Sequence, residues 1–353
     1  HRFLNLCGGY TDSVNTHSYA AAEVLLPHVI GSQDGLVRAH TSWPEIIAHT
    51  RLLVMFGGVP LRNTQVAAGG VGHHGVRDVL KSCRDAGVRF VAISPIRGDA
   101  PSELGAEWIA VRPNTDTALM LALAHTLVDE GLHDARFLAS HCVGFPRVLA
   151  YLRGEIDGQP KDAAWASAIC GVEAAAIRAL ARRMAATRTM IAVAWSLQRA
   201  DHGEQPLWAA ITLAAMLGQI GLPGGGFGFG YGGSNRIGVA SHGIAWPALP
   251  QGRNPVRDFI PLARLADMLL HPGESFDYDG GRHRYPDIRL IYWAGGNPFH
   301  HQSDLNRLRE AWRRPETVIV HEPWWNPLAR HADIVLPCTT PAERNDLGIA
   351  GDE

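Results

Sequence analysis

The sequence lacks the features by which several large classes of protein are recognised. Its 353 residues include only five cysteines, and no two of them form a CxxC pair. A zinc ribbon or an iron–sulfur cluster is therefore not expected within this stretch, and we expect mostly buried free thiols. The 18 histidines include no HExxH motif, so a helix-borne zinc site is not expected either.

An excess of charge of one sign is also missing. The chain has 32 Lys and Arg residues against 34 Asp and Glu residues, for a net charge of −2, which favours neither nucleic acid nor a charged membrane surface as a partner. No apolar run reaches the roughly 18–20 residues that span a bilayer. No secretory or twin-arginine signal is visible, but the chain begins at His1 without a Met. We interpret it as an excerpt of a longer protein, and its compartment, cytoplasmic or periplasmic, stays open.

Short apolar runs alternate with stretches of helical spacing along much of the chain. Hydrophobic residues make up 46% of the sequence, enough for large cores in two domains of ordinary size. This alternation predicts an α/β fold with mainly parallel, doubly wound sheets, which bind ligands beyond the carboxyl ends of their strands. We predict buried strands at 51–59, 88–93, 108–111, 190–194, 289–294, 317–321 and 330–336.

Helices are predicted between these strands. Residues 131–189 have the composition of helical packing material, and residues 224–243 that of a segment crossing between domains. Residues 245–288 are rich in proline, charge and Asp-Gly turns, so we expect an exposed excursion there. The individual helices are predicted at 19–26 (closing at Pro27), 74–85, 114–130, 206–218 and 304–312.

One stretch, residues 190–230, combines a strand, a polar turn and a helix. The apolar run ends at Ala194, the polar turn runs from Trp195 to Gln205, and Pro206 suits the first turn of a helix. Helix amides beside a strand end attract anions, and the five glycines within 224–230 allow backbone to approach a ligand closely. A βα unit followed by a flexible loop has the same spacing, so spacing alone leaves both interpretations open.

Two polar residues stand at predicted helix starts. Ser18 precedes an alanine-rich helix, where serine is a favoured N-cap and capping alone would explain it. Asp116 lies in the first turn of another helix, where a carboxylate stabilises the helix dipole. Residue type alone does not separate these structural roles from functional ones.

Several longer strings resemble one family of enzymes. They are WSLQR (195–199), HGEQ (202–205), GQIGLPGGGFG (218–228), HSYAAAEVLLPHVIG (17–31), ISPIRGDA (93–100), RPNTDTALMLAL (112–123) and most of 290–348. Together they resemble the dimethyl sulfoxide, trimethylamine N-oxide and biotin sulfoxide reductases over nearly the whole chain. The resemblance implies a molybdenum centre held by two molybdopterin guanine dinucleotides.

In this resemblance Ser18 falls on the molybdenum ligand and is the catalytic residue of the chain. A deprotonated serine oxygen is a hard donor, which suits a high-valent oxophilic metal. A cysteine or selenocysteine at this position would instead suggest the nitrate reductase or formate dehydrogenase relatives. Serine therefore favours oxide reduction.

The resemblance also implies cofactor contacts at the predicted strand ends. A carboxylate such as Asp116 can accept two hydrogen bonds from a guanine edge. In the first α/β block the implied contacts are Ser94, Arg97, Asp116, Trp195, Ser196, Arg199, His202 and Gln205. In the second block they are Gly296, Asn297, His321, Glu322 and Asp333.

An alternative for the second block is a catalytic acid–base pair of His321 and Glu322. No nucleophile is placed beside these two residues in the sequence, which counts against it.

The resemblance implies a domain division and an activity. Residues 19–225 would form domain III of such an enzyme, and residues 1–18 and 226–353 would form parts of domain II, both binding a dinucleotide cofactor. The implied activity is molybdenum-dependent reduction of a small-molecule S-oxide or N-oxide by oxygen-atom transfer. Its partners would be an electron donor protein or reduced cofactor and the remaining domains of the full-length chain, with no nucleic acid and no membrane span.

Two other classes of protein stay open. One is a non-catalytic or different-substrate member of the molybdopterin family. The other is a nicotinamide-dependent Rossmann dehydrogenase, against which the lack of a GxGxxG motif opening a helix after the first strand counts.

Overall fold

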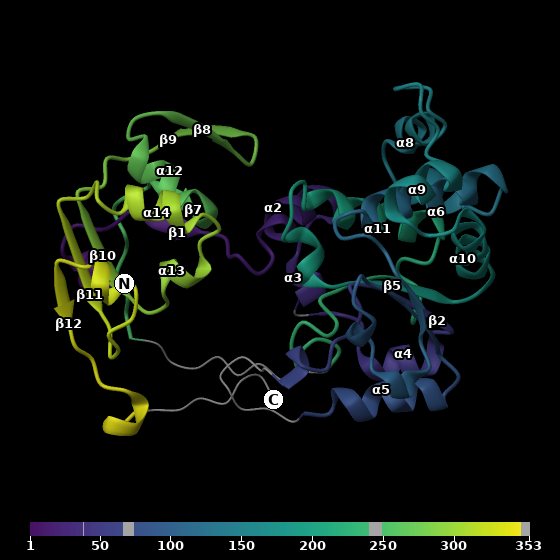
Figure 1. The fold of residues 1–353 in the computed structure, drawn as a ribbon. Coiled ribbons are helices and arrows are strands. Elements are labelled where there is room, and N and C mark those ends of the chain that lie inside the picture. Colours follow the sequence, from purple (N-terminus) through teal and green to yellow (C-terminus); the bar gives the residue numbers. More distant parts are fainter. Residues whose placement is uncertain (38, 66–73, 240–248, 347–353) are drawn as a thin grey trace. The chain divides into compact units, whose positions relative to one another are not determined.

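The computed structural model describes residues 1–37, 39–65, 74–239 and 249–346. Its contacts divide the chain into two compact units, each described here by itself (Figure 1). The larger unit comprises Ser18–Ile244 with Ile349–Glu353, and the smaller unit comprises His1–His17 with Ala245–Gly348.

A five-stranded parallel sheet forms the centre of the larger unit. The strands lie in the order β4-β3-β2-β5-β6. The chain winds outward from β2 through β3 to β4, then returns to the other side of β2 for β5 and β6. The order therefore reverses between β2 and β5, as in doubly wound folds. The strands are β2 (Leu52–Phe56), β3 (Arg89–Ile93), β4 (Glu107–Ile109), β5 (Thr189–Val193) and β6 (Gly226–Phe229).

Helices cover both faces of this sheet (Figure 1). Alternate residues of β2 point to opposite faces, so Leu52, Val54 and Phe56 join one core and Leu53 and Met55 join the other. The first core is formed with α2 (Ala20–Ile30), α3 (Asp34–Val37), α6 (Asp116–Asp129), α7 (Ala135–His141), α8 (Phe145–Leu152), α9 (Ala163–Cys170), α10 (Ala174–Ala186) and α11 (Glu204–Met216). The second is formed with α4 (Trp43–His49) and α5 (Val76–Asp85).

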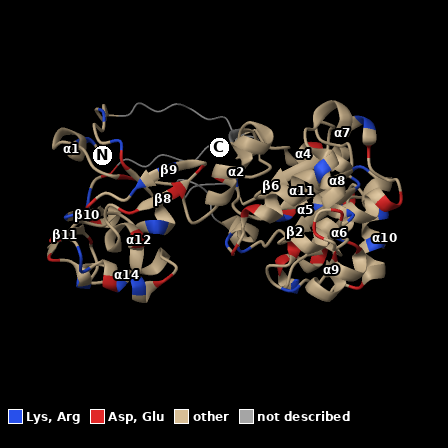
Figure 2. Cartoon of the chain, turned by 90° about the horizontal axis from the view of Figure 1, so that it is seen from above, with Lys and Arg blue, Asp and Glu red and all other residues tan. Residues whose placement is uncertain are grey.

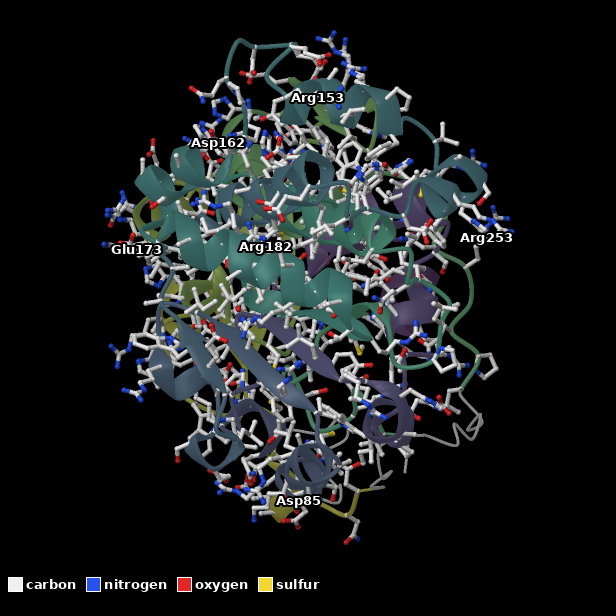
Figure 3. All side chains as sticks on the ribbon, turned by 90° about the vertical axis from the view of Figure 1, so that its right-hand side faces the viewer. Asp85, Arg153, Asp162, Glu173, Arg182 and Arg253 are labelled. Atoms are coloured by element: carbon white, nitrogen blue, oxygen red, sulfur yellow. The ribbon has the colours of Figure 1, made fainter. Side chains whose placement is uncertain are left out.

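Charged residues lie on the outer sides of these helical layers. In Figure 3, Asp162, Glu173 and Arg182 mark the layer of α9 and α10, and Asp85 marks the end of α5 on the opposite layer. Arg182 forms a two-pronged ion pair with Glu130, with N–O distances of 2.7 and 2.8 Å.

The smaller unit contains a three-stranded parallel sheet in the order β10-β11-β12. A second parallel pair joins β1 to β7, and β8 and β9 form an antiparallel hairpin. The strands are β1 (Asp12–Val14), β7 (Phe259–Pro261), β8 (Ser275–Tyr278), β9 (Gly281–Arg284), β10 (Leu290–Ala294), β11 (Thr317–His321) and β12 (Ile334–Leu336). The helices are α1 (Arg2–Leu6), α12 (Leu265–Leu270), α13 (Pro298–His301) and α14 (Leu305–Ala311).

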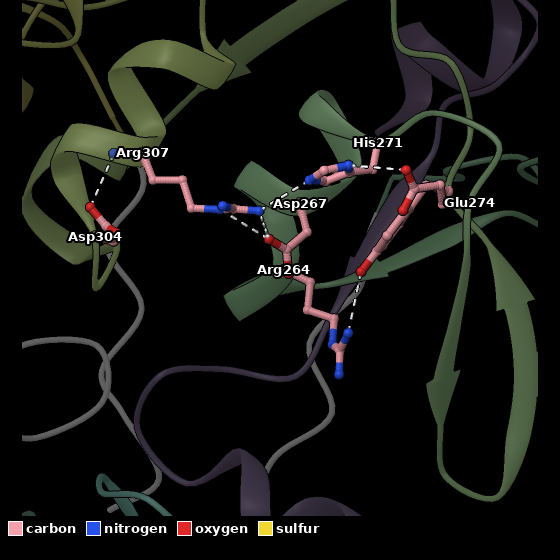
Figure 4. Close-up of polar contacts among 7 residues, drawn as sticks. Arg264, Asp267, His271, Glu274, Asp304 and Arg307 are labelled. Atoms are coloured by element: carbon pink, nitrogen blue, oxygen red, sulfur yellow. Dashed lines mark hydrogen bonds and ion pairs between the residues drawn. The ribbon is translucent and has the colours of Figure 1, made fainter.

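A polar network joins α12 to α14 (Figure 4). Arg307 donates to Asp267 from Nη2 at 2.7 Å and from Nε at 3.1 Å, and its Nη2 lies 3.3 Å from His271 Nε2. Asp304 caps α14 by accepting from Arg307 N at 3.0 Å. Basic and acidic residues are interspersed in each unit (Figure 2), in agreement with the balanced composition.

The expected exposed excursion at 245–288 is wrong from residue 259 onward. This part forms β7, α12 and the β8–β9 hairpin. Its apolar side chains, including Ile260, Met268, Leu269 and Phe276, are buried in the core of the smaller unit. Charged residues alternate with the buried ones inside these elements, so composition alone did not reveal the elements. Residues 240–248 lie outside the described part.

Two predicted boundaries also differ from the structure. Helix α2 continues through Pro27 to Ile30, because Leu26 is fully buried and Val29 packs on the same core. Strand β6 begins at Gly226 and pairs with β5. The larger unit therefore includes β6, which lies beyond the domain boundary that the sequence predicted at residue 225.

Within the described residues, no single helix has both the length and the apolar composition needed to cross a membrane. The pair α9 and α10 meets the criterion only together, with a bend of 116° between them.

Candidate functional site

The loops after β2 and β5 meet at the reversal of the strand order. Gly57 and Gly58 follow β2 with φ values of +85° and +70°. A Cβ on Gly57 would lie 2.6 Å from Ala194 Cβ, and one on Gly58 would lie 2.3 Å from Asp99 O, so only glycine allows this close approach. The 3-10 turn η4 (Trp195–Gln198) follows β5. Open α/β sheets bind ligands at such a position.

Turn η4 and the residue after it hold the segment that carries Ser18. Arg199 Nε donates to Ser18 O at 3.1 Å. Ala22 N donates to Gln198 Oε1 at 2.9 Å. The rings of Tyr19 and Trp195 pack with centroids 5.0 Å apart. The structure therefore brings the predicted metal ligand and the predicted cofactor turn together, although the bonded residues are separated by 176 and 181 positions in the sequence.

Two buried donors at this turn have no hydrogen-bond partner among the described residues. They are the indole Nε1 of Trp195 and the amide Nε2 of Gln198. Gly230 packs directly against the indole, since a Cβ there would lie 2.1 Å from Trp195 Nε1. An unsatisfied buried donor costs about 1–3 kcal/mol, so both groups suit a ligand that carries hydrogen-bond acceptors. The phosphates and ring heteroatoms of a pterin dinucleotide are acceptors of this kind.

The loop after β3 is organised by a residue that the sequence analysis missed. Asp99 is buried and accepts from Ser94 Oγ at 2.6 Å and from Arg62 Nη2 at 2.6 Å. Ser94 is only 2% exposed, and its hydroxyl also accepts from Ile96 N at 3.1 Å. The buried hydroxyl of Ser94 therefore stabilises the conformation of this loop through both hydrogen bonds. Asp99 stands in the ISPIRGDA string, which could have drawn attention to it. Its partner Arg62 lies on another loop, so no local pattern indicated that the two side chains form an ion pair.

Arg97 and Asp116 occupy the same edge of the sheet, after the neighbouring strands β3 and β4. Arg97 is exposed, and its guanidinium carbon lies 5.8 Å from the ring centroid of Trp108. Asp116 is the first residue of α6 and has no ion-pair partner in the described part of the chain. Burial raises the pKa of Asp116 to about 6, and a hydrogen bond from its own backbone N–H opposes this shift.

The remaining predicted contacts of the larger unit surround the start of α11. Ser196, His202 and Gln205 are all exposed. His202 has a φ of +53° and lies 3.8 Å from Asp201, while Gln205 Nε2 donates to Glu204 at 3.1 Å. These side chains point to solvent beside the turn that holds Ser18.

In the smaller unit, four predicted residues follow the ends of β10 and β11. Gly296 has a φ of +69°, and Asn297 caps α13 by accepting from Phe299 N at 3.0 Å. His321 Nε2 lies 2.5 Å from Tyr292 OH. Glu322 Oε1 accepts from Trp324 N at 3.3 Å.

Asp333 is not brought together with these four residues. Its carboxylate accepts from Val318 N at 2.8 Å, and its own N–H donates to Val318 O at 3.0 Å. Val318 is the second residue of β11, so Asp333 lies toward the amino end of the strands. Asp333 thus joins the start of β12 to β11 at the amino end of the strands. This end lies away from the edge that carries His321 and Glu322.

Among the residues described, no three His, Cys, Asp or Glu side chains are grouped so as to hold a metal ion.

Comparison with known proteins identifies the family of the chain. The whole chain, residues 1–353, matches the family model described as molybdopterin oxidoreductase. Biotin sulfoxide reductase of Cereibacter sphaeroides is 52% identical, over 98% of this chain and 46% of that protein. The dimethyl sulfoxide/trimethylamine N-oxide reductase of the same organism is 45% identical, over 99% of this chain and 44% of that protein.

Other relatives extend the comparison. Trimethylamine-N-oxide reductase of Haemophilus influenzae is 44% identical, over 99% of this chain and 44% of its own length. This chain thus spans slightly under half the length of the curated relatives that it matches. The structure of acetylene hydratase from Pelobacter acetylenicus has the same fold, with a TM-score of 0.55 at 16% identity over 95% of this chain and 46% of that one. From its fold and from a match that covers every residue, this chain belongs to the molybdopterin oxidoreductase family, which implies molybdenum and a molybdopterin cofactor.

Proposed function

We propose that this chain is part of a molybdenum-dependent reductase that removes an oxygen atom from an S-oxide or N-oxide. The observation that carries the proposal is the attachment of the Ser18 segment to the turn after β5, through Gln198 and Arg199. The backbone of Ser18 is thereby held beside the edge at which this sheet type binds ligands. The substrate class comes from the relatives, which are named as biotin sulfoxide, dimethyl sulfoxide and trimethylamine N-oxide reductases.

The proposed cofactor is a pair of molybdopterin guanine dinucleotides. In the larger unit, which we assign to domain III, the buried donors Trp195 Nε1 and Gln198 Nε2 support an acceptor-rich ligand. In the smaller unit, which we assign to domain II, the edge after β10 and β11 offers glycine backbone and the carboxylate of Glu322. The proposed contacts are Arg97, Asp116, Trp195, Ser196, Arg199, His202, Gln205, Gly296, Asn297, His321 and Glu322. The hydrogen bonds of Ser94 instead support the loop after β3, and those of Asp333 join β12 to β11.

When bound, the cofactor supplies the two-electron oxygen-atom chemistry. The chain holds the Ser18 backbone through Arg199 and provides the serine oxygen as a hard ligand. Asp116, with a pKa raised to about 6, accepts hydrogen bonds from a guanine edge when it is ionised, and those bonds stabilise its charge. An electron donor protein or a reduced cofactor, and the remaining domains, complete the proposed enzyme.

The test uses the full-length protein, expressed with a supply of cofactor. We expect about one molybdenum per chain by elemental analysis, and turnover of at least one of four oxides (dimethyl, methionine and biotin sulfoxides and trimethylamine N-oxide) with a dye as reductant. Lack of both molybdenum and tungsten would rule out the proposal. Bound metal without turnover of any oxide would indicate a non-catalytic or different-substrate member, and the absorbance of a bound nicotinamide in place of a pterin would indicate a dehydrogenase.

A further inference from the structure

Helix α2 lacks a side-chain cap of its own. The first N–H groups of a helix have no partner within the helix, and an N-cap Ser, Thr, Asp or Asn usually accepts from one of them. The N-cap of α2 is Tyr19, which makes no such bond. Ser18, whose residue type suits capping, stands one position before it.

The missing cap oxygen comes from a distant part of the chain. Gln198 Oε1 accepts from Ala22 N, the third residue of α2, at 2.9 Å. This is the N–H that an N-cap side chain would ordinarily take. Ala22 N shares its hydrogen between Gln198 Oε1 and the backbone oxygen of Tyr19, which lies 3.0 Å away. The side chain of Gln198 is only 7% exposed, so this bond is shielded from competing water.

We propose that Gln198 is a positioning residue, which caps α2 from the turn after β5 and so fixes the backbone at Ser18. The inference rests on the proposed role of Ser18 as metal ligand. The amide oxygen sets where the first turn of α2 lies relative to β5, while the neighbouring Arg199 holds Ser18 O.

A further property of Gln198 distinguishes it from a purely structural glutamine. Its Nε2 is buried with no partner among the described residues. Gln219, by contrast, has both ends of its amide engaged at the other end of β5. Its Oε1 accepts from Thr189 N at 2.7 Å and its Nε2 donates to Thr187 O at 2.8 Å. Gln219 is therefore a matched control for Gln198, because the two glutamines lie at opposite ends of β5.

The test compares Gln198→Met, Gln198→Glu and Gln219→Met in the full-length, cofactor-loaded protein. Methionine keeps the length of the side chain and removes the acceptor, whereas glutamate keeps an oxygen that can cap α2. For Gln198→Met we expect kcat to fall about 10- to 100-fold, as for other misplaced reacting groups, with KM changed less than about twofold. We also expect a shifted Mo(V) electron paramagnetic resonance spectrum, which loss of stability alone would not produce.

Gln198→Glu keeps the cap oxygen but loses the Nε2 donor, so we expect its spectrum to lie closer to wild type than that of Gln198→Met. Gln219→Met is expected to lower the melting temperature without altering the spectrum. The inference is overturned if Gln198→Met has the wild-type kcat and spectrum, or if Gln198→Glu shifts the spectrum as far as Gln198→Met does. Should Gln198→Met not accumulate, Gln198→Asn makes the same comparison, because its amide is one methylene too short to reach Ala22 N. A wild-type protein without metal or turnover would instead refute the proposed function.

Discussion

At position 18, a serine directly before an alanine-rich helix would be explained by capping alone. The structure places the N-cap at Tyr19 and supplies the cap oxygen from Gln198. The sequence could single out Ser18 because it stands in a recognisable string. It could not single out Gln198, because the role of that residue depends on a hydrogen bond to a partner 176 positions away.

Replacing Ser18 with Ala in the full-length protein should lower oxide turnover by at least about 100-fold. Even residues that only support a metal ligand cost 10- to 100-fold when replaced, and here the ligand itself is removed. Turnover with a dye reductant measures the effect. The matched control is Ser140→Ala, at an exposed serine in α7 that bonds to carbonyls of its own helix and to His141. Near-normal turnover in Ser18→Ala would show that the ligand assignment is wrong.

Asp116 provides a prediction of pH dependence. Its pKa is raised from 3.8 to about 6 by burial, so the folded protein holds this proton more tightly than the unfolded chain. The resulting stabilisation is fully present below about pH 4 and is lost as the pH rises through 6. Asp116→Asn carries no charge at any of these values. We expect it to raise the free energy of unfolding of the cofactor-free, full-length protein by up to about 3 kcal/mol at pH 7.5, and to change it little at pH 4.

Chemical unfolding at the two pH values measures this difference. The control is Asp129→Asn, at the exposed far end of the same helix α6, where removal of the charge should have a similar effect at both pH values. An equal effect of Asp116→Asn at pH 4 and pH 7.5 would contradict the raised pKa.

Among the elements, those with strong apolar periodicity were predicted well. Strand 190–194 corresponds to β5, strand 317–321 to β11, and helix 206–218 to α11. The errors lie where tertiary packing overrides local signals. Burial of Leu26 carries α2 past Pro27, and pairing with β5 makes a strand of the glycine-rich 226–229.

Helix α9 allows a test of capping at the scale of one element. Asp162 accepts from Trp165 N at 2.7 Å as the N-cap of α9, whereas Glu173, the N-cap of α10, makes no such bond. We expect Asp162→Ala to lower the free energy of unfolding by about 1 kcal/mol, and Asp162→Asn, which can cap, to restore it. Thermal or chemical unfolding would measure both. Glu173→Ala is the control and should change stability little; an equal loss in both alanine variants would rule out the capping explanation.

For the whole molecule, burial differs strongly between the two sheets. Every residue of β2 and β5 is buried, whereas β12 is exposed at two of its three positions and β10 at two of five. Amides of deeply buried strands exchange only by the largest openings. We therefore expect hydrogen exchange of the full-length, cofactor-free protein to be slowest in β2, β3 and β5. Exchange in β10 and β12 as slow as in β2 would contradict this expectation.

The sequence by itself determined the α/β class, the position of most strands and helices, and the family, because these depend on periodicity and on contiguous strings of residues. Only the tertiary structure decided that the larger unit includes β6, that Asp333 lies apart from Glu322, and that Asp99 organises the loop after β3. It alone showed that Gln198 and Arg199 hold the segment of Ser18. Each of these depends on hydrogen bonds or strand pairing between residues distant in sequence, which no local pattern records.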